Sequence, residues 1–250
     1  MEYRHAPRAD HTALSPGAVL VSAPGHPAFP VRLGLELLGR CLDHLAPAGP
    51  VTVWDPCCGS GALLTAMALG WRDRLRAVAA SDVDPEPLAL ARRNLALLSA
   101  EGLAERATEL SRLEQLHGKE SHRAAAQAAA GLAAGLASKG ADLPAVVEPV
   151  DALDPAACAT FARRVRPDVV ITDVPYGEQT QWTTTHGTAG SPDALVASLA
   201  SALDPHAVIA VVAQDRKVRL SDGTGVLERF RSGHRAGVIV RAGARQPSGR

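Results

Sequence analysis

The stretch VTVWDPCCGSGALLTAMALG, residues 51–70, is the most informative part of this chain about its fold. The run VTVW at 51–54 has the length and β-branching of a buried parallel strand, and ALLTAMALG at 62–70 has the composition of a helix. Between them lies DPCCGSG at 55–61, a turn with two glycines. The stretch therefore predicts a strand, a glycine loop and a helix, the unit from which open parallel sheets are built.

The rest of the chain repeats this alternation, which predicts an α/β fold with a mostly parallel sheet and helices on both faces. The further predicted strands cover residues 76–81, 145–150, 167–172 and 207–214, and 225–243 predicts a closing strand pair. The predicted helices cover residues 31–45, 62–70 and 191–203, and one more begins near residue 85. For that last helix, Asp84 is the expected N-cap and Pro85 the expected first helical residue.

Two segments stand apart from the alternation. The first thirty residues are rich in Pro, Gly and His and predict an arm, so that residues 1–48 form an N-terminal arm and helix. Residues 101–140 predict an inserted helical hairpin, with helices at 104–117 and 121–140 separated near Gly118 and ended by Gly140. We expect a single domain over residues 1–250, since 250 residues with 46% hydrophobic and 21% charged content form an ordinary globular composition.

Charge and cysteine content narrow the class of protein. No window approaches a membrane span, and the start MEYRHAPRAD lacks a secretory signal, so we expect a cytoplasmic protein. The four cysteines show no CxxC spacing, which favours reduced thiols and no metal. The net charge is zero, but from Arg216 onward basic residues outnumber acidic ones, so this third of the chain could face phosphate.

The glycine turn is expected to bind a nucleoside cofactor, because Gly59 and Gly61 let a ligand approach the main chain. The GxGxxG spacing of NAD-binding proteins is absent. The form D-x-x-x-G-x-G instead resembles the first motif of S-adenosylmethionine-dependent methyltransferases. That resemblance implies a Rossmann-like class I methyltransferase in which Asp55 meets the amino-acid part of the cofactor. Cys57 then occupies a turn position that requires only a small residue.

Acidic residues after the next two strands complete this prediction. Asp82 ends the second strand, where a carboxylate can accept hydrogen bonds from both ribose hydroxyls. Asp151 follows the third strand, where this fold commonly contacts the adenine amino group. Asp154 is a rival for that contact, and both could be turn residues.

The sequence PDVVITDVPYG at 167–177 supplies a candidate acceptor site. It resembles the [D/N]-P-P-[Y/F] motif of methyltransferases that modify planar nitrogens, with Val174 in place of the first proline. The Asp173 carboxylate and the Val174 carbonyl can hold the protons of an amine, Pro175 stiffens the turn, and Tyr176 can stack on a base. This resemblance implies catalysis at residues 173–176.

The length, the arm, the DPCCGSG turn and the insert together resemble the avilamycin-resistance ribosomal RNA guanine methyltransferases. The resemblance implies methyl transfer to the exocyclic amine N2 of a guanine in large-subunit ribosomal RNA, with S-adenosylmethionine as cofactor. We also expect no membrane partner and a monomer. The residues expected to contact RNA are Trp182, Arg216, Lys217 and Arg219.

Three other functions stay open from the sequence. A protein glutamine methyltransferase needs the same two acceptors for its amide nitrogen, although the basic C-terminal third favours RNA. A DNA adenine methyltransferase is a further alternative without an obvious target-reading domain. A cofactor-binding module without catalysis would bind S-adenosylmethionine and transfer no methyl group.

Overall fold

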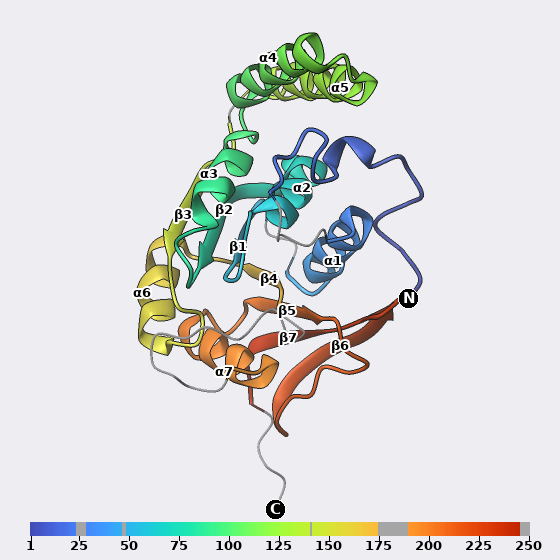
Figure 1. Ribbon diagram of the computed structural model, residues 1–250. Coiled ribbons are helices and arrows are strands. Elements are labelled where there is room, and N and C mark those ends of the chain that lie inside the picture. The colour runs from blue at the N-terminus through green and yellow to red at the C-terminus, as the bar shows by residue number, and fades with distance from the viewer. Residues whose placement is uncertain (24–28, 47–48, 141, 175–189, 246–250) are drawn as a thin grey trace, which may run out of the picture.

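The computed structural model describes residues 1–23, 29–46, 49–140, 142–174 and 190–245. These residues form a seven-stranded sheet in the order β3-β2-β1-β4-β5-β7-β6 (Figure 1). The strands β1 to β5 pair in parallel, and β7 runs antiparallel between β5 and β6. Their bounds are β1 Val51–Asp55, β2 Leu75–Asp82, β3 Ala145–Pro149, β4 Val169–Asp173, β5 Val208–Ala213, β6 Thr224–Ser232 and β7 Arg235–Arg245. The predicted α/β fold is confirmed, including the closing strand pair.

All helices except α4 and α5 form one layer on each face of the sheet. One layer consists of α1, α2 and α3, which share a buried cluster with the sheet, and the other consists of α6 and α7. The helices are α1 Val31–Asp43, α2 Ala62–Gly70, α3 Leu88–Ala96, α4 Ala100–His117, α5 Glu120–Ala137, α6 Pro155–Val165 and α7 Pro192–Ala202, with short 3-10 turns at Thr12–Leu14 and Arg72–Arg74. Among the described residues, no helix is long and apolar enough to cross a membrane.

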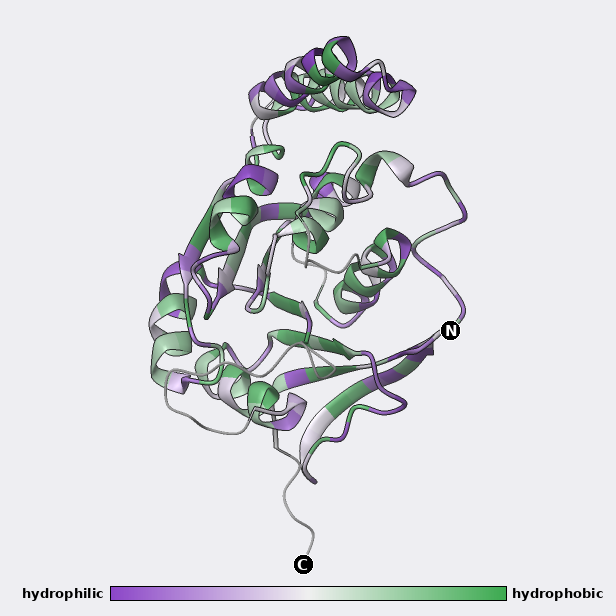
Figure 2. Cartoon of the chain, viewed as in Figure 1, coloured by the Kyte–Doolittle hydropathy of each residue, from purple (hydrophilic) through white to green (hydrophobic). Residues whose placement is uncertain are grey.

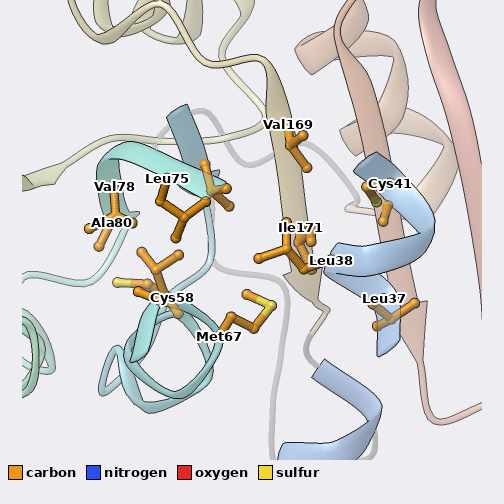
Figure 3. Packing of buried hydrophobic residues seen from close by; sticks show 14 of the residues in the cluster. Leu37, Leu38, Cys41, Cys58, Met67, Leu75, Val78, Ala80, Val169 and Ile171 are labelled. Atoms are coloured by element: carbon orange, nitrogen blue, oxygen red, sulfur yellow. The ribbon is translucent and has the colours of Figure 1, made fainter. Parts of the chain in front are cut away.

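Neighbouring residues of each strand enter different layers, because successive side chains of a strand point to opposite faces. Val53 and Val169 are buried beneath the first layer, and Trp54 and Val170 are buried beneath the second. Figure 3 shows Ile171 of β4 beside side chains of α1 in the first layer. Strand β5 is buried along its whole length, and Figure 2 shows it as a hydrophobic strand in the middle of the fold. The continuous apolar runs of these strands thus reflect burial on both faces.

The N-terminal arm is packed more tightly than its composition predicts. Val19 and Leu20 are fully buried and join a cluster with α4 and α5. Nearer the start of the chain, the amides of Arg4, His5 and Ala6 donate to the buried Glu36 carboxylate at 2.7 to 3.0 Å. The arm therefore contributes to the core, and its backbone donors find a buried acceptor on α1.

The helical insert is confirmed, with shifted ends. Helix α4 begins at Ala100 because the Ser99 hydroxyl caps it, accepting from the Gly102 amide at 3.0 Å. Gly118 ends α4 in the left-handed conformation with φ 65°. Helix α5 ends at Ala137, ahead of the expected stop at residue 140. Figure 1 shows the α4–α5 pair projecting beyond the sheet.

The start predicted for α3 is wrong. The helix begins at Leu88, and the Asp84 carboxylate accepts from the Glu86 amide at 2.9 Å in a turn that precedes it. Glu86 is followed by Pro87, and the residue before a proline is disfavoured in helical conformation. Asp84 therefore shapes the connection between β2 and α3 and does not cap the helix.

Candidate active site

Three aspartates meet at one edge of the sheet. Asp55, Asp82 and Asp173 are the last residues of β1, β2 and β4. Asp55 pairs with Ala80 and Val53 pairs with Val169, so Asp82 and Asp173 both lie two residues farther along than Asp55. In each strand the residue two positions earlier is buried under α1, α2 and α3. Because side chains alternate along a strand, all three aspartates lie on that same face of the sheet.

This edge is also where the connections of the sheet change direction. From β1 the chain passes to β2 and β3 on one side and later to β4 and β5 on the other. Ligands of open parallel sheets bind in the crevice at such a switch point, beyond the carboxyl ends of the strands. Asp82 and Asp173 flank this position from its two sides.

The turn between β1 and α2 gives the crevice an accessible backbone. Gly59 and Gly61 have φ values of 49° and 71°, a region that favours glycine. A Cβ at Gly61 would lie 2.8 Å from Leu95 Cδ1 and 3.1 Å from Ala91 Cα, so this glycine is required for packing against α3. A Cβ at Gly59 would meet no described atom within 4 Å. The main chain at Gly59 is therefore open to close approach by a bound molecule.

Asp82 joins this turn to the end of β2. One carboxylate oxygen accepts from the Gly59 amide at 2.9 Å, and the other accepts from the Asp84 amide at 3.1 Å. Burial raises the pKa of Asp82 above its ordinary value, and the two amides act against that rise. Each carboxylate oxygen has a second lone pair, so Asp82 retains the capacity to accept from a pair of vicinal hydroxyls.

Asp55 is more deeply placed, with 2% of its surface exposed. Burial raises the pKa of Asp55 to about 7, and the negative charges of Asp82 and Asp173 add to the rise. Its Oδ1 accepts from the Cys57 amide at 3.2 Å. In the described structure this carboxyl shapes the start of the glycine turn, and its predicted contact with the cofactor stays a prediction.

The adjacent cysteines point to opposite faces of the sheet. Cys58 belongs to the cluster under α1, α2 and α3, where Figure 3 shows it near Met67, whereas Cys57 packs against the cluster under α6 and α7. Both are free cysteines, and burial raises the pKa of both thiols well above the ordinary value. Two protonated thiols that face different layers do not provide a joint ligand pair for one metal ion.

The two candidates for the adenine contact have different surroundings. Asp154 caps α6, and its Oδ1 accepts from the amides of Ala156 at 2.8 Å and Ala157 at 3.3 Å. Asp151 lies just after β3 and is 8% exposed, and its Oδ1 accepts from the Leu153 amide at 2.9 Å. Asp154 serves as the cap of α6, which favours Asp151 for a ligand contact.

Asp173 stands on the other side of the glycine turn. Burial raises its pKa to about 6, and the charge of Arg235 opposes that rise. Arg235 Nη2 lies 3.9 Å from Asp173 Oδ2. The buried Asp173 Oδ1 accepts no hydrogen bond from the described residues. A polar atom of this kind is costly to leave unsatisfied, so it fits a hydrogen-bonding group of a substrate.

Val174 stands where the [D/N]-P-P-[Y/F] motif has its first proline, and the structure gives a reason for this difference. The Val174 amide donates to the Val212 carbonyl at 2.9 Å and so extends the pairing of β4 with β5. A proline has no amide hydrogen and could not donate here. The valine side chain is 1% exposed and packs in the cluster under α6 and α7. Pro175, Tyr176 and Trp182 lie outside the described residues.

Exposed cations follow β5 at the same edge. Arg216, Lys217 and Arg219 are exposed, and between them Val218 is 3% exposed and anchors the segment in the core. Of the other basic residues in the C-terminal third, Arg229 donates to the Val218 carbonyl and Arg241 donates to the His44 carbonyl, whereas Arg231 is exposed as well. The segment 216–219 therefore supplies the part of the predicted basic surface that lies at the edge of the three aspartates.

Three residues near the site were missed from the sequence: Arg235, Phe29 and Asn94. Arg235 counted only as one of many basic residues, and Phe29 only as part of the arm. Asn94 lies inside a predicted helix and is fully buried. The helical periodicity could have indicated this burial, because Asn94 lies next to the buried positions Ala91 and Leu95. Each acts through a partner far away in the sequence, so no local pattern identifies it.

Two surface grooves lie away from the three aspartates. A groove of about 550 Å³ is lined by α7 and the start of β6, and one of about 650 Å³ is lined by Arg76, Arg163 and Arg166 at the opposite edge of the sheet. Neither includes a strand-end carboxylate. The switch point therefore remains the candidate active site.

A sheet of this order, with an open glycine turn after β1 and an acidic residue ending β2, defines a class I S-adenosylmethionine-dependent methyltransferase. The sequence pattern of the rRNA methyltransferase AviRa family matches residues 1–235, and this chain belongs to that family. A protein of Streptomyces viridochromogenes named 23S rRNA (guanine(2535)-N(1))-methyltransferase is 49% identical over 244 residues, which are 96% of each chain. Two solved structures of the rRNA methyltransferase AviRa from Streptomyces viridochromogenes match with a TM-score of 0.88 and 48% identity, over 97% of both chains.

Proposed function

We propose that this protein transfers a methyl group from S-adenosylmethionine to N1 of a guanine in 23S ribosomal RNA. The sequence led to N2, the exocyclic amine, whereas the relative from Streptomyces viridochromogenes is named for N1. The observation that carries the proposal is the state of Asp173: a largely buried carboxylate with a raised pKa and an oxygen that accepts nothing from the described residues. These properties suit a base that removes a proton from a ring nitrogen.

The two target atoms make different demands on the enzyme. N2 is an amine, whose protons need only acceptors and whose extra proton leaves readily after methylation. N1 is a ring nitrogen that carries a proton in neutral guanine, so its lone pair becomes available only when that proton leaves. A base with a pKa of about 6 is ionised at neutral pH and accepts a proton more readily than an ordinary aspartate. Asp173 therefore has a larger part in N1 than in N2 methylation.

Residues on one side of the glycine turn bind the cofactor, and Asp173 on the other side acts on the guanine. Bound S-adenosylmethionine supplies an electrophilic methyl group on a positively charged sulfur. Asp82 accepts hydrogen bonds from the ribose hydroxyls, Asp151 meets the adenine amino group, and the open backbone at Gly59 admits the cofactor. Asp173 would take the N1 proton as N1 takes the methyl group from sulfur, which leaves neutral S-adenosylhomocysteine, and Asp173 would later release that proton to water.

The acceptor guanine must be unpaired or flipped out of any base pair to reach Asp173, since N1 lies on the Watson–Crick edge. The exposed cations Arg216, Lys217 and Arg219 would hold the neighbouring phosphates. The Val174 carbonyl and Tyr176 would orient and stack the base, as the resemblance of the motif implies. We further propose that the modification protects ribosomes against avilamycin, on the strength of the family resemblance alone.

One experiment tests the target. The protein is incubated with labelled S-adenosylmethionine and with unmodified 23S rRNA, DNA or total protein, and the labelled nucleoside is identified by mass spectrometry. We expect 1-methylguanosine in 23S rRNA, with a reverse-transcription stop at one guanine because the methyl group blocks Watson–Crick pairing. 2-Methylguanosine would overturn the N1 assignment, and label only in DNA or protein would overturn the RNA assignment. Growth of a sensitive host on avilamycin, with and without the active protein, tests the protective role.

A further inference from the structure

Arg235 interacts with both Asp173 and Phe29, although the three residues come from distant parts of the chain. Arg235 Nη2 is 3.9 Å from Asp173 Oδ2, and the side chains are only 13% and 17% exposed. Arg235 Cζ also lies 5.1 Å from the centroid of the Phe29 ring, which is the geometry of a cation–π contact. The guanidinium thus interacts with both a carboxylate and an aromatic ring.

The topology explains why these residues meet. Asp173 pairs with Val212 across β4 and β5, and Val212 pairs with Gly237 across β5 and β7. Because β7 is antiparallel, its first residue, Arg235, lies at the edge where the parallel strands end. Arg235 and Gly237 are two residues apart on β7, so both lie on the same face of the sheet. Ile239, two residues farther along, belongs to the cluster with α1, so Arg235 lies on the face that α1 covers. Phe29 packs against the cluster under that layer, just before α1 begins.

We propose that Arg235 is a positioning residue for methyl transfer, which orients the Asp173 carboxylate toward the guanine and is itself held by the Phe29 ring. This inference rests on the proposed function of Asp173. At 3.9 Å the pair is a charge interaction and is longer than a hydrogen bond, so the carboxylate oxygens keep their lone pairs for the substrate.

The charges around Asp173 make this cation important. Burial acts against the ionised carboxylate, and Asp55, at the end of β1, adds a neighbouring carboxyl. Asp82 at the end of β2 is a further carboxyl at this edge. Arg235, from β7, is the group that favours ionised Asp173 among the described residues. Its loss would leave Asp173 protonated up to a higher pH.

The test compares Arg235→Gln with Arg235→Lys in single-turnover methylation of 23S rRNA over the acid and neutral pH range. For Arg235→Gln we expect the acid limb of the rate profile to move to higher pH by about one unit, the lower end of the effect of an opposite charge at ~4 to 6 Å. The rate above that limb should fall about tenfold, because the carboxylate is less well oriented. Arg235→Lys keeps the charge, so its acid limb should stay near that of the wild type.

Phe29→Leu provides a second test that leaves both charged groups in place. We expect a severalfold lower rate and an unmoved acid limb, whereas Phe29→Tyr should be close to the wild type. The matched control is Arg241→Gln, on the same strand as Arg235. Arg241 donates to the carbonyls of His44 and His206, so its loss should lower the melting temperature without moving the acid limb.

Three outcomes would overturn the inference. One is an Arg235→Gln profile that coincides with the wild type, and another is an Arg235→Lys profile that coincides with Arg235→Gln. The third is a rise in the KM for RNA alone, which would make Arg235 a substrate contact. Asp173→Ala separates this failure from that of the proposed function: a fully active Asp173→Ala enzyme would remove the role of Asp173 itself.

Discussion

Asn94 and Val21 exchange two hydrogen bonds: the Val21 amide donates to Asn94 Oδ1 at 2.8 Å, and Asn94 Nδ2 donates to the Val21 carbonyl at 3.0 Å. The same Nδ2 donates to the Ser60 carbonyl at 2.9 Å. Ser60 lies between Gly59 and Gly61 of the glycine turn. A single buried side chain of α3 therefore fixes the N-terminal arm beside that turn.

Asn94→Ala should disconnect the arm from the turn. The change leaves polar backbone groups of Val21 and Ser60 without this partner, so we expect a loss of about 1 to 3 kcal/mol in the free energy of unfolding. We also expect about tenfold weaker S-adenosylmethionine binding, measured by calorimetry. Arg106→Gln is the matched control, because Arg106 holds the arm through the carbonyls of Ala18 and Val19 and does not contact the turn. Equal cofactor affinity in wild type and Asn94→Ala would contradict the coupling.

The two glycines of the turn should respond differently to a side chain. Gly61→Ala places a Cβ against α3 and should destabilise the fold, whereas Gly59→Ala meets no described atom and costs only the strain of a positive φ, about 1 to 2 kcal/mol. Gly59→Ala should nevertheless weaken cofactor binding at least tenfold, since its methyl group enters the space proposed for the ligand. Chemical denaturation and calorimetry on the same samples separate the two effects. Undiminished affinity in a folded Gly59→Ala protein would place the cofactor elsewhere.

Substitutions of Asp173 distinguish N1 from N2 methylation. Asp173→Ala should slow single-turnover methyl transfer by about a hundredfold or more while cofactor affinity stays nearly constant. If Asp173 removes the N1 proton, Asp173→Asn should be about as slow, because an amide accepts a hydrogen bond but not the proton. If it only orients an exocyclic amine, Asp173→Asn should retain appreciable activity. In the wild type, the rate should fall as the pH drops through about 6, where Asp173 becomes protonated.

Asp55 should make the cofactor-free protein more stable in acid than at neutral pH. Its pKa is about 7 in the folded protein and near 3.8 when unfolded, so between these values the folded state binds the extra proton. The stability it contributes is present below about pH 4 and is lost as the pH rises through about 7. Asp55→Asn should remove this slope and raise stability at neutral pH by up to about 4 kcal/mol, since the two pKa values differ by about three units and each unit corresponds to about 1.4 kcal/mol.

Denaturant titrations at several pH values check this prediction. The amide oxygen of Asp55→Asn can still accept from the Cys57 amide, so the turn should persist. An unchanged slope would mean that Asp55 is ionised at neutral pH. Calorimetry on the same variant tests the sequence-based contact with the amino-acid part of the cofactor, which predicts weaker binding.

The cations after β5 should contribute to RNA affinity. Replacement of Arg216, Lys217 and Arg219 by Gln should weaken binding and reduce the slope of log affinity against log salt, by roughly 0.7 to 0.9 for each phosphate that is no longer neutralised. The matched control replaces Arg74, Arg163 and Arg166, which are exposed at the opposite edge of the sheet. If the control changes the slope and the first set does not, RNA binds the other edge.

The order of elements and the place of the site follow from the sequence. A strand of β-branched residues followed by DPCCGSG and an apolar helix allows few folds, and parallel strands bring their carboxyl ends to one edge. Asp55, Asp82 and Asp173 could therefore be placed together without coordinates, because each follows an apolar run that is long enough for one strand. Each such run is contiguous in the sequence, so it can be recognised without knowing which distant residues pack against it.

Features that depend on distant pairs follow only from the folded chain. Val174 replaces a proline because Val212 of the next strand needs its amide, and α3 begins late because Pro87 follows Glu86 in a turn closed by Asp84. Asn94 contacts Val21, and Arg235 contacts Asp173 and Phe29. These partners are far apart in the sequence, so no periodic pattern of residues indicates that they meet. Burial of these side chains also sets the pKa values of the carboxyls. Composition and spacing therefore indicate the fold and the edge of the sheet, but the surroundings of Asp173 depend on neighbours that only tertiary packing supplies.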